Sequence, residues 1–164
     1  MAKAMLLLVI TLALAGCGND ATLDGKIGGS EATFVEAHGP NQQDEDAEGL
    51  SALFEYMSES GIATIFIEDH AVHLLVSLDN EEDSGLTLED ALDYTEDFIP
   101  EDAKLVEEGE VLQKQVYIYE SELLHEAVGG EDSDTQAFSI RLTGDGEDRF
   151  TLAEIKTEQL DEDE

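Results

Sequence analysis

The sequence is short of cysteine, tryptophan, proline and positive charge. Its 164 residues include one Cys, no Trp, two Pro and 7 Lys or Arg, against 41 Asp or Glu. A single thiol cannot form a disulfide within the chain, so no disulfide framework stabilises this fold. The formal net charge of −34 opposes binding to nucleic acid and to anionic lipid headgroups, because like charges repel.

Motifs of known catalytic chemistry are also missing from the sequence. There is no Gly-x-Ser-x-Gly nucleophile elbow and no glycine-rich phosphate loop. The carboxylates are so numerous that no single pair stands out as a general acid and base. The lack of Trp gives no support to a carbohydrate-binding platform. The sequence therefore predicts a protein that is not an enzyme and that needs no cofactor.

The acidic residues accompany a composition that is able to fold. Hydrophobic residues make up 41% of the chain, which indicates a core coated with acid rather than a disordered acidic chain. The Debye length falls from about 10 Å at 0.1 M salt to about 3 Å at 1 M, so brine would relieve the self-repulsion of the surface. Our hypothesis for the charge is therefore halophilic adaptation.

The N-terminus has the pattern of a secretory signal. Lys3 supplies a positive charge, and the apolar run 5–13 follows it. This run is far shorter than the ~20 residues that span a bilayer. A positive start, a short apolar stretch and small residues at its end are typical of a signal peptide that is removed. The run closes on Leu14-Ala15-Gly16-Cys17.

This tetrapeptide resembles the lipobox of bacterial lipoproteins. The resemblance implies that the Cys17 thiol is diacylglycerylated, that the chain is cut before it, and that the new N-terminus often carries a further acyl chain such as palmitate. Two or three acyl chains anchor stably, since each buried methylene contributes about 0.8 kcal/mol. We therefore expect a lipid-anchored, extracytoplasmic protein at the outer membrane or cell surface. The alternatives are an ordinary secretory signal with a chance cysteine, or a buried apolar segment.

The rest of the chain predicts one domain of mixed structure. We expect a signal peptide at 1–16, a tether at 17–28, a single domain at 29–157 and an acidic tail at 158–164. Helices are expected after Ser30, Thr87 and Ser121, which are good N-caps. Strands are expected at 50–58, 62–67, 72–78, 111–119, 137–143 and 149–155. The predicted fold class is α+β, an antiparallel sheet with two to three short helices packed on one face.

A second, looser resemblance concerns the start of the domain. The run Gly28-Gly29-Ser30, then Phe34, then Gly39-Pro40, leads from a short helix into a β-meander. It is similar to a pattern in small bacterial lipoproteins, and loosely to the small accessory lipoprotein of the outer-membrane barrel-assembly machinery. That family has a two-helix, three-strand fold without an active site and binds other envelope proteins. This resemblance implies a binding or scaffolding module, although this chain adds a helix and strands after Pro100.

One acidic segment suggests an alternative function, the binding of calcium. Asp79, Glu81 and Asp83 have alternate spacing and Asp90 follows, as oxygen ligands do in a calcium loop. Ser84 stands where the sharp turn needs glycine, and Asp90 replaces a longer bidentate glutamate. A solvated acidic loop is the simpler interpretation.

Two further pairs of residues are candidates for binding. His70 and His73 lie three apart in an expected hairpin, where a regular strand would direct them to opposite faces, so we do not expect them to bind one metal together. Tyr117 and Tyr119 share a strand face. They form either an exposed aromatic patch for a partner or a surface that a helix covers.

Overall fold

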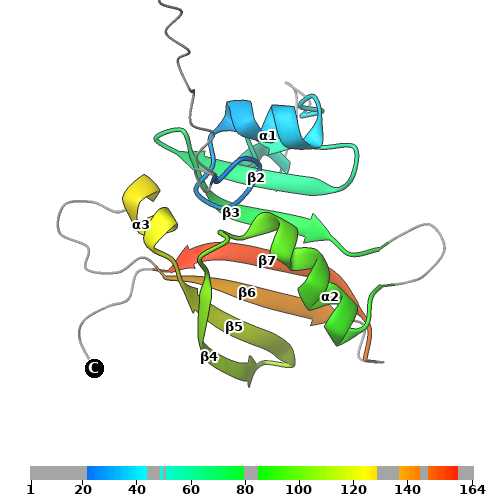
Figure 1. Cartoon of the computed structure of the whole chain (residues 1–164). Coiled ribbons are helices and arrows are strands. Elements are labelled where there is room, and N and C mark those ends of the chain that lie inside the picture. Colours follow the sequence, from blue (N-terminus) through cyan, green and yellow to red (C-terminus); the bar gives the residue numbers. More distant parts are fainter. Residues whose placement is uncertain are drawn as a thin grey trace, which may run out of the picture.

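The computed structural model describes residues 22–43, 49, 51–79, 85–128, 137–144 and 148–158. These residues form a seven-stranded antiparallel sheet and three α-helices (Figure 1). The predicted α+β class is therefore confirmed. Cys17, Glu81 and Asp83 lie outside the described residues.

The elements follow one another in an order that splits the sheet into two halves. They are α1 (Glu31–His38), β1 (Tyr56–Met57), β2 (Ile62–Ile67), β3 (His70–Ser77), α2 (Leu88–Thr95), β4 (Lys104–Val111), β5 (Lys114–Glu120), α3 (Glu122–Val128), β6 (Ala137–Gly144) and β7 (Phe150–Glu158), with 3₁₀ turns at Ser51–Leu53 and Glu96–Phe98. The strand order is β1-β2-β3-β7-β6-β5-β4. The chain builds β1–β3, crosses with α2 to the far edge, and returns until β7 pairs with β3.

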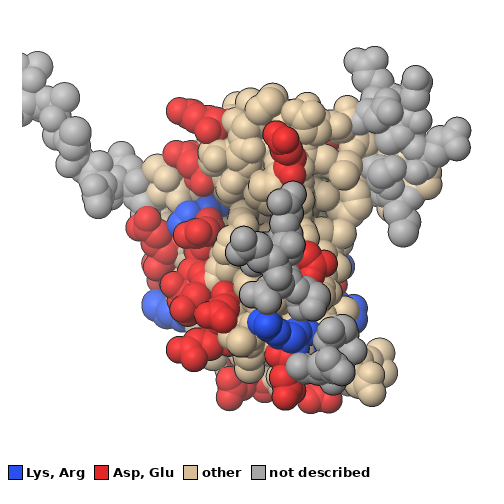
Figure 2. Space-filling view, turned by 90° about the vertical axis from the view of Figure 1, so that its right-hand side faces the viewer, with Lys and Arg blue, Asp and Glu red and all other residues tan. Residues whose placement is uncertain are grey.

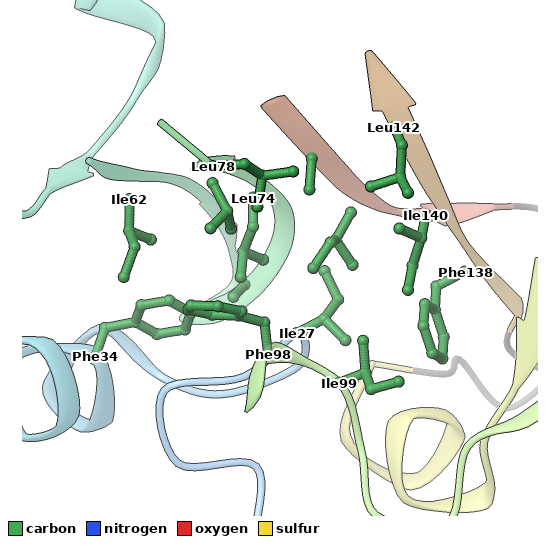
Figure 3. Packing of buried hydrophobic residues seen from close by; sticks show 14 of the residues in the cluster. Ile27, Phe34, Ile62, Leu74, Leu78, Phe98, Ile99, Phe138, Ile140 and Leu142 are labelled. Atoms are coloured by element: carbon green, nitrogen blue, oxygen red, sulfur yellow. The ribbon is translucent and has the colours of Figure 1, made fainter. Parts of the chain in front are cut away.

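The core lies between the sheet and the helices. Alternate residues of β6, Phe138, Ile140 and Leu142, are buried as the alternation predicts. Ile155 of β7 stands between Ile140 and Leu74, its register partners on β6 and β3. Figure 3 shows these side chains gathered with those of the helices and the N-terminal segment. The pairing of β3 with β7 thus joins the two halves through a single core.

Local capping explains where the helices begin. In α1 the Ser30 hydroxyl accepts the N–H of Thr33 at 3.4 Å, and Gly39 ends the helix with φ 92°. In α2 the Thr87 hydroxyl accepts the N–H of Asp90 at 3.2 Å and donates to its carboxylate at 2.7 Å. The helices expected after Ser30 and Thr87 are therefore confirmed.

The prediction for 111–119 is wrong in its extent, because this region contains a hairpin rather than one strand. β4 and β5 pair around a two-residue turn, Leu112-Gln113, with φ values of 51° and 65°. Leu112, expected on a strand face, is at this turn and is 91% exposed. The sequence hides β4 because all eight of its residues are exposed, so burial imposes no polar and apolar alternation on it.

Three expected boundaries also change. The strand expected at 50–58 is reduced to the two residues of β1, preceded by a 3₁₀ turn. Residues 22–28, expected within the tether, belong to the domain, since Ile27 is fully buried. Glu158, expected in the tail, is the last residue of β7 and accepts hydrogen bonds from Ser139 and Arg141.

Candidate functional site

The segment that leads from Cys17 into the domain is bound to two distant elements. The N–H of Ile27 donates to the carbonyl of Phe98 at 2.9 Å, and the N–H of Gly28 donates to the carbonyl of Ala71 at 2.7 Å. In return, the N–H of Ala71 donates to the carbonyl of Gly29 at 2.8 Å. Figure 3 shows Ile27 within the core beside Phe98 and Ile99. This segment is therefore an integral part of the fold.

Two histidines hold the same segment from outside. The Nε2 atom of His38 lies 2.8 Å from the carbonyl oxygen of Gly25, and the Nδ1 atom of His70 lies 3.0 Å from that of Gly28. A carbonyl oxygen only accepts, so each of these ring nitrogens carries the hydrogen. The His38 ring also stacks on Phe98, with 5.5 Å between ring centroids. The histidines therefore have structural partners.

The tight attachment limits the distance between Cys17 and the domain. Only six residue steps separate Cys17 from Leu23, whose carbonyl accepts the N–H of Lys26 at 3.0 Å. An extended chain spans at most about 3.5 Å per residue, so this connection reaches roughly 20 Å. A lipid on Cys17 would hold the domain within that distance of a membrane.

A cavity of about 390 Å³ opens between the end of α2 and β5. Its walls combine apolar side chains with an amine, two carboxylates and a phenol, from Lys26, Leu92, Thr95, Glu96, Ile99, Pro100, Glu101, Ala103 and Tyr119. The Thr95 hydroxyl donates to the carbonyl of Leu92 at 2.7 Å, which occupies its hydrogen. The cavity therefore offers hydrogen bonds and charge for binding, and it shows no hydroxyl paired with a base.

Tyr119 carries the clearest electrostatic perturbation in this cavity. Burial raises the pKa of its phenol, and the neighbouring Tyr117, Glu96 and Glu108 raise it further. The phenol therefore stays protonated at neutral pH as a hydrogen-bond donor. The ring stacks on Phe138 with an interplanar angle of 9°. Tyr117 is buried, so the two tyrosines are covered on the helix side and do not form an exposed aromatic patch.

The β4–β5 hairpin, unlike the cavity, presents exposed apolar and acidic side chains. Leu105, Val106 and Val111 of β4 are 48–58% exposed, and Leu112 at the turn is almost wholly exposed. Figure 2 shows acidic side chains gathered over the lower part of one face, the end of the molecule at which β4 and β5 lie in Figure 1. These apolar side chains lie near the two ends of β4, with Leu105 opposite Tyr119 and Val111 opposite Lys114, so they do not form one continuous patch.

The expected calcium ligands are not brought together in the described residues. Asp79 is exposed after β3, and the Asp90 carboxylate is bound by the Thr87 hydroxyl as a helix cap. His70 and His73 have separate partners as well. His70 lies against the carbonyl of Gly28, whereas the Nε2 atom of His73 lies 3.0 Å from the Glu154 carboxylate on β7. Within the ranges that the structure describes, no group of three His, Cys, Asp or Glu could hold a metal ion. The calcium loop therefore stays a prediction.

Asp102 is a structurally important residue that the sequence did not reveal. Its carboxylate accepts the Ser121 hydroxyl at 2.6 Å and the N–H groups of Glu122 and Leu123 at 2.8 and 3.1 Å. Burial raises the pKa of this carboxyl, but the hydrogen bonds lower it by more, and the pKa ends below its ordinary value. Asp102 thereby ties the start of β4 to the N-terminus of α3. No local spacing signals a partner 19 residues away.

Comparisons with known proteins gave no relative. No model of a protein family matches the chain, and no curated protein or solved structure does so either. Among the described residues, no helix has the length and apolar character needed to cross a bilayer.

Proposed function

We propose that this protein is a lipid-anchored, extracytoplasmic binding or scaffolding module of the cell envelope rather than an enzyme, with Cys17 as its acylation site. The observation that supports this is the attachment of the N-terminal segment, in which Ile27 is fully buried just ten residues after Cys17. Anchor and domain are thus joined by a short connection. A module held close to a membrane in this way meets its partners at the membrane surface.

The acidic charge of the domain affects how it can lie next to an anionic membrane. A connection of at most roughly 20 Å keeps the domain within about two Debye lengths of the bilayer at 0.1 M salt. Repulsion between anionic headgroups and its acidic surface favours an extended connection at that salt, and molar salt screens most of this repulsion. The lipid therefore provides the attachment, and the protein surface remains free for a partner other than the membrane.

The described surface offers two places for such a partner. The cavity beside Tyr119 combines apolar side chains with an amine, two carboxylates and a phenol donor, and the β4–β5 hairpin presents exposed apolar side chains among acids. Neither brings a nucleophile next to a base, which favours binding over catalysis.

The test is to replace the acylated atom. Cys17→Ser removes the thiol, and we expect the variant to leave the membrane fraction and appear in the soluble or secreted fraction. The control is Thr22→Ala, a substitution near the anchor but outside the motif, which should stay in the membranes. Mass spectrometry of the N-terminal peptide should show acyl chains in the parent chain and in this control, and none in Cys17→Ser. A Cys17→Ser chain that remains fully membrane-bound would show that the anchor is not the lipid.

A pull-down from membranes in the native salt addresses the partner. The full chain is cross-linked in place, and captured envelope proteins are compared with those captured by the Cys17→Ser chain. We expect an envelope protein enriched with the anchored chain. Capture of the same set by both chains would contradict a role that depends on the membrane position.

A further inference from the structure

The two edge strands of the sheet, β1 and β4, differ in whether another segment covers them. On the β1 edge, the N–H of Gln42 donates to the carbonyl of Met57 at 2.7 Å, and the Asn41 side chain accepts the N–H of Met57 at 3.0 Å. The segment after α1 therefore covers this two-residue strand. At the other edge, all eight residues of β4 are exposed, and within the described part of the chain no strand pairs with its outer side (Figure 1).

An open edge of this length is a template for another strand. In an antiparallel ladder, alternate residues of β4 direct their N–H and C=O groups away from β5. Proteins disfavour unwanted pairing at such edges with bulges and charges. β4 has a register shift between Leu105 and Glu107, and beyond it a regular ladder to Val111 with three glutamates in five residues. The glutamates therefore oppose pairing with an acidic strand, while the regular ladder leaves main-chain groups that a strand of opposite charge can bind.

The register fixes where these charges lie. Glu108 stands opposite Tyr117 and Glu110 opposite Gln115, so both glutamates are on the face of the sheet that carries the helices. The Gln115 amide donates to Glu110 at 3.3 Å, in agreement with this placement. Gly109 lies between them and faces the other side, where a Cβ would meet nothing within 4 Å. One face therefore offers two carboxylates, and the other carries Glu107, opposite Ile118, with open space over Gly109.

These features argue against a second copy of this chain as the occupant. Pairing of β4 with β4 would place the acidic strand of one molecule against the acidic strand of another, and both molecules carry a formal charge of −34. Like charges directly opposite each other destabilise a strand pair. The occupant that complements this edge is basic.

We propose that the outer edge of β4 binds an extended segment of a partner protein by strand addition. Two basic side chains at alternate positions of that segment face Glu108 and Glu110, and a bulky apolar residue between them covers Gly109. The main-chain hydrogen bonds supply affinity and the alternate side chains supply specificity. This inference names the kind of partner for the binding function proposed above and in that sense rests on it.

The first test measures whether binding of a basic peptide depends on which of its main-chain amides are methylated. The peptide Lys-Val-Lys-Val-Lys-Val-Lys, carrying a fluorophore, is titrated with the full chain in detergent at the lowest salt at which circular dichroism shows the folded domain. Two derivatives carry three N-methyl groups each, either on the amides of the last three lysines or on those of the three valines. Because alternate amides of a strand point to opposite sides, one derivative should lose at least tenfold in affinity and the other should retain it. Equal affinities of the two derivatives, high or low, would overturn strand addition.

The second test concerns the two glutamates. The double variant Glu108→Gln and Glu110→Gln should weaken peptide binding by about threefold to tenfold, the effect of two surface ion pairs. The control is Glu31→Gln with Glu36→Gln, two exposed glutamates of α1 that give the same change in net charge. Less than a twofold effect is expected for the control. Equal losses in the two double variants would mean that the peptide senses only the overall charge, and the proposed edge would be wrong.

These measurements are independent of the anchor. Peptide binding requires neither acylation of Cys17 nor the natural partner. Loss of membrane attachment in Cys17→Ser together with equal binding of both methylated peptides would reject the β4 edge and keep the proposed function. If a chain that carries no lipid binds one methylated peptide and not the other, the β4 edge is kept and the anchor is rejected.

Discussion

Asp102→Ala is the most informative test of how the second half of the domain is held together. The substitution removes three hydrogen bonds that reach the first turn of α3, two from N–H groups and one from the Ser121 hydroxyl. Hydrogen bonds to a charged group contribute about 1.5–3 kcal/mol each when buried. Asp102 is partly exposed, so water replaces much of this. Loss of a helix N-cap costs about 0.5–2 kcal/mol, and we expect a loss of about 2 kcal/mol.

The assay is thermal and chemical unfolding followed by circular dichroism at pH 7. A loss of this size lowers the Tm by about 5–10 °C in a domain of this length. The matched control is Asp97→Ala, which removes an exposed carboxylate from the 3₁₀ turn after α2 and gives the same change in net charge. A Tm for Asp102→Ala within 2 °C of the control would refute the structural role of Asp102.

The pH dependence supplies an independent check on the same residue. The pKa of Asp102 in the folded chain is below its ordinary value of 3.8. A depressed pKa means that the carboxylate stabilises the fold at pH values above 3.8, and that this contribution disappears as the pH falls below 3.8 through the folded-state pKa. The difference in unfolding free energy between the parent chain and Asp102→Ala should therefore be constant near pH 7 and shrink below pH 3.8. A difference that grows on acidification would have the wrong sign.

Further predictions concern the N-terminal segment, the salt and the calcium loop. Ile27→Ala should lower the unfolding free energy by about 2–5 kcal/mol in denaturant titrations, because Ile27 is fully buried; a change below 0.5 kcal/mol would place it outside the core. Gly29→Ala should destabilise strongly, since a Cβ there would lie 2.1 Å from the Leu23 carbonyl oxygen, whereas Gly109→Ala, in open space, should leave the Tm unchanged. The Tm should rise between 0.1 M and 1 M salt as the Debye length shortens, and an unchanged Tm would reject halophilic adaptation. Calorimetry with calcium in high salt tests the acidic loop at 79–90, and the absence of saturable heat would exclude a specific site.

Interactions within a few residues were readable from the sequence. Ser30 and Thr87 cap helices through hydrogen bonds three residues ahead, and Ser121 does the same for Leu124. The strand expected at 137–143 alternates large apolar residues with small or polar ones, and the structure places Phe138 and Ile140 in the core, with Ala137 and Ser139 also buried. The α+β class follows from such local signals, because each depends on neighbours along the chain.

The candidate sites were largely hidden from the sequence. The cavity beside Tyr119 is lined by residues from Lys26 to Tyr119, and no spacing along the chain connects them. β4 has no burial pattern because both its faces are exposed. Its importance comes from its place at the end of the strand order, and that order is decided by long-range pairing.

The sequence by itself determined the helix caps, the hairpin of β2 and β3, the acidic surface and the motif around Cys17, whose acylation remains a prediction. Tertiary structure decided that Ile27 belongs to the core and that Asp102 binds α3. It also decided that β7 lies beside β3 and leaves β4 at an open edge. The physical reason is the range of the forces involved. A cap or an alternating strand satisfies its hydrogen bonds and burial nearby, whereas these three contacts form only when segments far apart in the chain meet in one core.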